Sequence, residues 1–270
     1  MSSSISLPAV PRVTPSPWNA FGGIWRLTAR RFTTRNYWIG VAVLLSILAL
    51  FTGAVVRRED GATQFFSLAK VVYLTIILPL TAFVFTAAAI RDDLKPSSVD
   101  YVFTRPIRRT AFVLFKYLSQ MICLQIDFLL AFTILFCTGI YRHVPGLFEA
   151  APILLFAQVL LVMAFSAFGF FCGVITSRYM VVGLIYAAVV EVGVGQLPTQ
   201  LSKIAMTRQI LGMIEPTMSR VAPRLSNHAA EVPGILATVG LLCAFTLAMI
   251  SLAALFFSHQ ELAGGKSPQS

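Results

Sequence analysis

The sequence predicts an all-α integral membrane protein with six transmembrane helices and an N-terminal amphipathic helix in the membrane interface. Hydrophobic residues make up 57% of the 270-residue chain, charged residues make up 12%, and the mean hydropathy is +0.80. Soluble domains carry about 25% charged residues, so this composition places most of the chain in hydrocarbon. No apolar run shows the alternating pattern of a membrane barrel strand, so we expect the spans to be helices.

Six apolar runs are each near or above the roughly 20 residues that a helix needs to cross a bilayer. They lie near 37–56, 71–90, 112–140, 151–176, 179–197 and 232–257. Only Ser177 and Arg178 separate the fourth run from the fifth, which predicts a tight helical hairpin. We therefore expect a membrane domain over 18–257, a disordered tail over 1–17 and a C-terminal tail over 258–270.

Residues 18–34 are expected to form the interfacial helix that precedes the first span. Aromatic residues recur there at helical spacing with arginines alongside, which favours rings in the headgroup boundary and guanidinium groups on lipid phosphates. The expected anchors are Trp18, Phe21, Trp25, Arg30 and Arg31.

The net charge of +10 is spread over segments that flank the apolar runs. A basic stripe for nucleic acid is therefore not indicated, and attraction to anionic lipid explains the charge better. More of the 21 lysine and arginine residues fall inside if the N-terminus is cytoplasmic. This bias predicts that both termini lie in the cytoplasm. We also expect the protein to be integral to the plasma (inner) membrane.

The motifs of catalysis and metal binding are not found in the sequence. The four cysteines, all in apolar runs, have no CxxC or Cys/His spacing, and no HExxH motif occurs. Gly265-Lys266-Ser267 is similar to the end of a P-loop, but Gln260 stands where the first glycine is required. We expect no catalytic residue, no metal and no cofactor in this chain.

The segment 91–109 is the most charged connection between two runs. Ser97 or Ser98 is a candidate N-cap, and the apolar residues that follow have the i, i+3, i+4 spacing of one helical face. Pro106 would end that helix, because the residue before a proline favours extended geometry. The segment therefore predicts a short amphipathic helix at the membrane surface, ringed by basic residues.

Residues 90–117 resemble the cytoplasmic loop of ABC transporter permeases of the type-2 exporter branch. In that family an acid after the second span leads into a short helix, then an Arg-Pro-Ile/Val-Ser/Arg-Arg motif, then a Gly-Lys that opens the third span. Asp92 or Asp93 matches the acid, and Lys116 together with the run 104–109 matches the remainder. Ser97 departs from the usual glycine at the helix start, and Phe115 departs from the glycine before the lysine.

The resemblance implies a permease subunit of an ATP-driven exporter. Two such chains, identical or homologous, would assemble with two copies of an ATPase subunit that holds ATP and Mg. The loop over 91–109 and the turn at 177–178 would contact that subunit and couple its closure to transport. The implied coupling residues are Asp92, Asp93, Ser98, Asp100, Val102, Phe103, Arg105, Pro106, Arg108, Arg109 and Arg178.

Two carboxylates fall inside apolar runs, Asp127 in the third and Glu191 in the fifth. A charge there costs several kcal/mol, so each should face protein or water, or be protonated. Both lie on stripes of small residues, where helices approach closely. They are candidates for a translocation path or gate, and an interhelical hydrogen bond is the simpler alternative.

Other features leave two alternatives each. The outer connection over 198–231 should hold an amphipathic helix on the outer leaflet until Pro216 and Pro223 break the chain, either capping the path or serving as a surface loop. Stripes at Gly169/Gly173 and at Gly240-Ala244-Ala248 predict close packing, within the bundle or between two chains. Two other functions stay open: a membrane-embedded enzyme using Asp127 and Glu191, and an ion-coupled secondary carrier.

Overall fold

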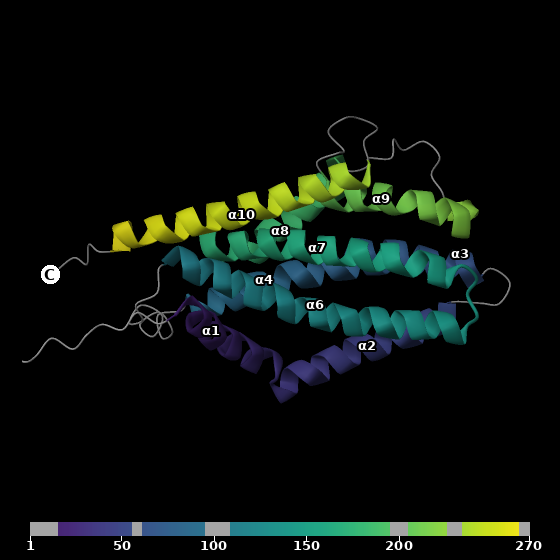
Figure 1. Cartoon of the computed structure of the whole chain (residues 1–270), viewed down its shortest axis with the longest axis horizontal. Coiled ribbons are helices and arrows are strands. Elements are labelled where there is room, and N and C mark those ends of the chain that lie inside the picture. The colour runs from purple at the N-terminus through teal and green to yellow at the C-terminus, as the bar shows by residue number, and fades with distance from the viewer. Residues whose placement is uncertain (1–15, 56–60, 95–108, 195–204, 226–233, 265–270) are drawn as a thin grey trace, which may run out of the picture.

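The computed structural model describes residues 16–55, 61–94, 109–194, 205–225 and 234–264, and these residues form helices and short turns without a strand. Figure 1 shows an elongated bundle whose long helices run along one axis. The helices that begin the chain are α1 (Pro17–Phe32), α2 (Arg35–Val55), α3 (Gly61–Ser67), the π-helix η1 (Leu68–Ile77) and α4 (Leu78–Asp93). Those that follow are α6 (Arg109–Tyr141), α7 (Leu147–Ile175), α8 (Tyr179–Tyr186), the π-helix η2 (Ala187–Val194), α9 (Met206–Val221), the 3₁₀ turn η4 (Pro223–Leu225) and α10 (Ile235–Gly264).

Five helical stretches are long and apolar enough to cross a membrane, which confirms the all-helical membrane class. They are Tyr37–Ala54, Gly61–Asp93, Thr110–Tyr141, Leu147–Ile175 and Ile235–Ser258. The fifth predicted run corresponds to the shorter apolar helix Tyr179–Glu191. As predicted, only a short turn separates that helix from α7.

Two predicted boundaries were wrong, the start of the second run and the break at Pro216. The second run begins at Gly61 rather than near 71, because α3, η1 and α4 form one unbroken helical stretch that takes Lys70 into its interior. The last apolar span ends at Ser258, next to the predicted end near 257, and the helix itself continues to Gly264. Pro216 lies inside α9 and does not end it.

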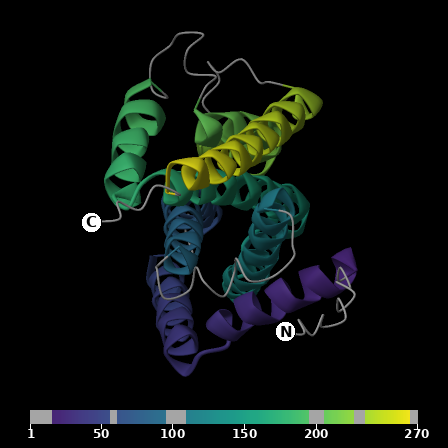
Figure 2. The ribbon, with the colours of Figure 1, turned by 90° about the vertical axis from the view of Figure 1, so that its left-hand side faces the viewer.

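The two ends of the bundle are named here by residues that lie at them. At the Asp93 end, Ile90 of α4, Val113 of α6, Val174 of α7 and Phe257 of α10 share one hydrophobic cluster. At the Gly146 end, the turn between α6 and α7 meets Val221 at the end of α9. Seen along the axis, α1 crosses the flank of the bundle obliquely, whereas α4, α6 and α7 lie closer to its centre (Figure 2).

Helix α7 is the centre of the packing, because its side chains are buried along most of its length. The predicted small-residue stripe at its C-terminal half contacts α4 within the same chain. A Cβ atom on Gly173 would lie 2.7 Å from the carbonyl oxygen of Ala87, and one on Gly169 would meet the backbone of Phe83. The second stripe is different, since Gly240 of α10 has open space where a Cβ would be.

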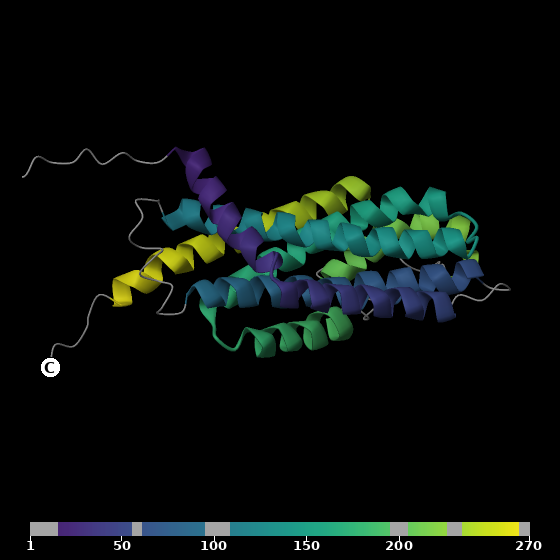
Figure 3. The same cartoon turned by 90° about the horizontal axis from the view of Figure 1, so that it is seen from below.

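Helix α9 was predicted to rest on the outer leaflet, and this was wrong. Its apolar side chains Met206, Ile210, Met213, Ile214 and Met218 are all buried, and the helix packs along α7. Figure 1 places it beside α7 in the half nearer the Gly146 end, and Figure 3 shows α8 on a different side of the bundle. The chain after α8 therefore returns into the bundle before it reaches α10.

We expect Gly173→Val to destabilise the monomer by about 2–3 kcal/mol, because the added atoms meet backbone that cannot move aside. Gly240→Val is the matched control and should leave monomer stability within about 0.5 kcal/mol. Thermal unfolding in detergent micelles measures both. Equal stability of the two variants would contradict the close approach of α4 and α7.

Candidate functional site

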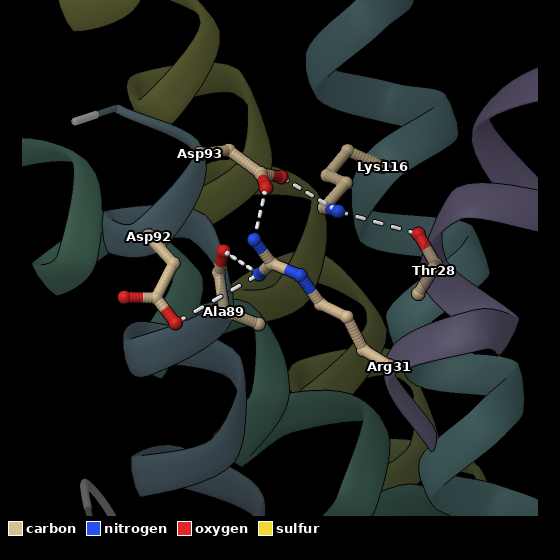
Figure 4. Close-up of polar contacts among 6 residues, drawn as sticks. All are labelled: Thr28, Arg31, Ala89, Asp92, Asp93 and Lys116. Atoms are coloured by element: carbon tan, nitrogen blue, oxygen red, sulfur yellow. Dashed lines mark hydrogen bonds and ion pairs between the residues drawn. The ribbon is translucent and has the colours of Figure 1, made fainter. Parts of the chain in front are cut away.

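The most concentrated charge cluster of the described residues joins three helices at the Asp93 end (Figure 4). The carboxylate of Asp93, at the end of α4, accepts from two cations through its two oxygens. Arg31 Nη2 of α1 lies 2.8 Å from Oδ1, and Lys116 Nζ of α6 lies 2.6 Å from Oδ2. One acid thus holds α1, α4 and α6 together.

Further contacts complete the surroundings of the two cations. Arg31 Nη1 donates to the carbonyl oxygen of Ala89 at 2.9 Å and lies 4.0 Å from an Asp92 oxygen. Lys116 Nζ lies 3.3 Å from the Thr28 hydroxyl oxygen. The Lys116 side chain is only 5% exposed and that of Asp93 16%, whereas Arg31 is 38% exposed. Lys116 is therefore the cation that depends most on its partner, because burial removes its water.

The local sequence explains how these residues meet. The cap of α4 at Leu94 follows Asp93 directly, and its N–H donates to carbonyls of the last helical turn. Lys116 comes two turns after α6 begins at Arg109. The ion pair therefore closes the loop that leaves α4 and enters α6. The other predicted coupling residues of this loop, Ser98, Asp100, Val102, Phe103, Arg105, Pro106 and Arg108, lie outside the described residues.

Helix α1 uses its predicted anchors in different ways. Trp18 is 81% exposed, whereas Phe21 packs edge-on against Phe115 of α6 and stacks with Trp25. Arg30 is exposed, whereas Arg31 has its polar partners within the protein. Arg31 binds the acids and carbonyl at the end of α4 because α1 lies against α6 within reach of them.

Of the two remaining predicted coupling residues, Arg109 is the first residue of α6, and Arg178 lies in the turn between α7 and α8. The backbone N–H of Arg178 donates to the Thr176 hydroxyl at 3.1 Å, and the residue is exposed. Helix α7 runs from the Gly146 end to the Asp93 end, so this turn and the Asp93 cluster lie at the same end of the bundle. The structure brings together Asp92, Asp93, Arg31 and Lys116. Arg178 lies at the same end of the bundle.

Asp127 lies in the middle of α6 and accepts a hydrogen bond from the Tyr37 hydroxyl of α2. Tyr37 also packs edge-on against Phe32 and Phe85. The contact joins the first span to the third. It fits the simpler alternative, an interhelical hydrogen bond.

Glu191 caps the N-terminus of α9. Its two carboxylate oxygens accept the backbone N–H groups of Met206 and Thr207, each at 3.2 Å, and Oε1 also accepts from the Tyr186 hydroxyl at 3.1 Å. The first N–H groups of a helix have no partner within the helix, and Ala205 at the N-cap position has no side-chain acceptor. A carboxylate from η2 supplies it, and its charge also suits the positive end of the helix.

Sequence reasoning missed a second contact that holds α9. Lys70 Nζ of η1 lies 2.9 Å from Glu215 Oε2 of α9, and both side chains are at least 87% buried. The signal was present, because Lys70 directly precedes an apolar run and Glu215 lies among apolar residues at helical spacing. Both acids that hold α9 thus act between it and a π-helical segment, the kind of helical defect that often marks functional sites.

No model of a known protein family matches the chain, and no curated protein matches it. The assignment of a function therefore rests on the residues and geometry of this chain.

We expect Asp93→Asn to lower stability by about 3 kcal/mol, because it leaves Arg31 and the buried Lys116 facing each other without a counter-charge. Asp92→Asn is the matched control: Asp92 lies 4.0 Å from Arg31 and its side chain is half exposed, so the loss should be below about 1 kcal/mol. Denaturation of both variants in micelles provides the measurement. Similar losses would mean that Asp93 does not hold the cluster.

We expect Glu191→Ala to free the start of α9 at a cost of about 1–2 kcal/mol, because two helix N–H groups lose their acceptor. Glu191→Gln keeps one acceptor oxygen and should lose less. Hydrogen exchange of the peptide over 206–213 reports the change, and Glu149→Ala, which removes an exposed acid of α7, is the control. Unchanged exchange in Glu191→Ala would exclude the capping role.

Proposed function

We propose that this chain is the membrane permease subunit of an ATP-driven ABC exporter, with ATP and Mg held by a partner ATPase. The carrying observation is the ion pair between Asp93 and Lys116. These two residues stand near opposite ends of the segment that resembles the type-2 permease loop, and their charged atoms lie 2.6 Å apart. The motif residues thus support a loop whose two ends are fixed to each other.

In this proposal the chain has six spans in the plasma (inner) membrane, with both termini in the cytoplasm. The fifth span is formed by α8 and η2, and α1 lies in the inner interface with Trp18 among headgroups. Trp18 is exposed and Ile24 is buried on the same helix, which supports this position of α1. The Asp93 end then faces the cytoplasm.

Coupling would pass through the Asp93 cluster. Two ATPase subunits would contact the 91–109 loop and the turn at Arg178. Because Asp93 holds both Lys116 and Arg31, a pull on the loop would move α1, α4 and α6 together. A rigid-body movement of this kind is a common way to alternate between two open states.

A second permease chain would complete the path. The stripe at Gly240, Ala244 and Ala248 supports this assembly, because these small residues are exposed and Gly240 has open space in front of it. Small residues allow close helix contacts in lipid, where apolar burial supplies little driving force.

The alternatives have less support from the geometry. An enzyme with Asp127 and Glu191 as acid and base needs both groups at one reacting bond. Each carboxylate instead has its own structural partner, Tyr37 on α2 or the start of α9. An ion-coupled carrier would also use an acid inside the membrane, and co-purification of an ATPase distinguishes the two transport classes.

Replacing Val102 and Phe103 together with Asp should abolish co-purification of the ATPase, because two charges would enter the apolar docking face. The chain should still enter the membrane fraction. The matched control replaces Ala229 and Ala230 with Asp, since these residues belong to the connection proposed to lie outside. The readout is an affinity-tagged chain isolated from its native membranes, assayed for bound ATPase by mass spectrometry and ATP hydrolysis. Retention of the ATPase by the loop variant, or loss by the control alone, overturns the docking role.

A further inference from the structure

Helix α6 carries a line of polar side chains along one face. Lys116, Gln120, Cys123 and Asp127 follow one another at spacings of four, three and four residues, which keeps them on the same side of an α-helix. At 1.5 Å per residue the line covers about 16 Å of the helix. It runs from the Asp93 cluster to the hydrogen bond between Asp127 and Tyr37.

The middle of this line holds polar atoms that the protein does not satisfy. Gln120 and its neighbour Ser119 are fully buried. Both amide atoms of Gln120 and the hydroxyl oxygen of Ser119 have no hydrogen-bond partner among the residues described. Buried polar groups nearly always have a partner, and inside a bilayer no bulk water is available to supply one. A small polar ligand would satisfy these three atoms.

Both ends of the line are charged or polar, and the middle is close to both. The thiol of Cys123 lies within electrostatic range of both Lys116 and Asp127. A ligand beside Gln120 must donate to Oε1 and accept from Nε2, which a water molecule does in a small space. An anion would accept only, and a metal cation would leave the amide N–H groups unsatisfied.

We propose that water molecules occupy this face of α6, bound by Ser119 and Gln120, and give protons access to Asp127 from the Asp93 end. The water would connect the buried ammonium of Lys116 with the Asp127–Tyr37 pair. This hydrated track is a property of the chain itself. It does not depend on the proposed ATPase partner, so its test and the co-purification test fail separately.

Radiolytic labelling of the purified full-length chain tests the proposal. X-rays split water where it is bound, and the hydroxyl radicals modify the side chains next to it. Cys123 is the reporter, and Cys172 is its control within the same molecule. Both thiols are buried, at 7% and 4% exposure, but Cys172 lies in an apolar cluster with Phe83 and Phe168. When the chain is pre-incubated in ¹⁸O-water, ¹⁸O in the modified side chain shows that the added oxygen came from exchangeable bound water rather than from dissolved oxygen.

We expect Cys123 to be modified about tenfold faster than Cys172, because only Cys123 has bound water beside it. Gln120→Leu should lower the rate at Cys123 to that of Cys172. Gln125→Leu is the matched control, because Gln125 also has a buried amide oxygen without a partner among the residues described, but it lies on another face of α6 and donates to the carbonyl of Val159. It should leave Cys123 unchanged.

Two results would overturn the track: equal modification of Cys123 and Cys172 in the unaltered chain, or an unchanged Cys123 rate in Gln120→Leu. If Gln120→Leu does not fold, the comparison of the two cysteines in the unaltered chain still decides, and Ser119→Ala supplies a milder variant. If no water binds Gln120, the Gln120→Leu variant should have a higher thermal stability than the unaltered chain, because the substitution removes an unsatisfied polar group. Such an increase would also contradict the track.

Discussion

The carboxylate of Asp93 is the contact on which the Asp93 end of the bundle depends. It is mostly buried, and each of its oxygens serves a different cation on a different helix. Removing this buried charge is costly, because its cationic partners, already separated from water by burial, then lose their counter-charge. Apolar packing alone would leave the depth of α1 poorly defined, since lipid tails solvate its apolar side chains as well as α6 does. The ion pairs fix which turn of α1 lies beside α4 and α6.

The same reasoning applies to α9, which lies in the half of the bundle nearer the Gly146 end. Its apolar side chains could be buried in several ways against α7, but Glu191 accepts only from N–H groups at a helix start, and Glu215 must reach Lys70. Two acids therefore specify both the position and the direction of this helix. Inside a membrane, directional polar contacts determine arrangement while shape complementarity supplies most of the attraction.

Composition and periodicity were enough to predict the membrane class, five of the six expected spans as long apolar helices, and the short turn at Arg178. They failed where tertiary contacts decided the outcome. The sequence predicted that Lys70 belongs to the loop before the second run. It lies inside a helix instead, where Glu215 is its partner. Pro216 looked like a break, although α9 continues past it when packed on α7. Arg31 looked like a lipid anchor because the acids that bind it are some sixty residues away in the sequence. Single-sequence patterns cannot reveal such partners.

The distribution of contacts also indicates which parts of the bundle can move relative to one another. Gly169 and Gly173 let the backbone of α7 touch that of α4, so these helices have no room to slide and form a fixed pair. Helix α2, by contrast, is mostly exposed, and Tyr37 gives it a polar contact with α6. Helix α8 has no buried residue at all. A conformational change in this chain would therefore keep α4 and α7 together, and the peripheral helices would shift by exchanging a small number of hydrogen bonds.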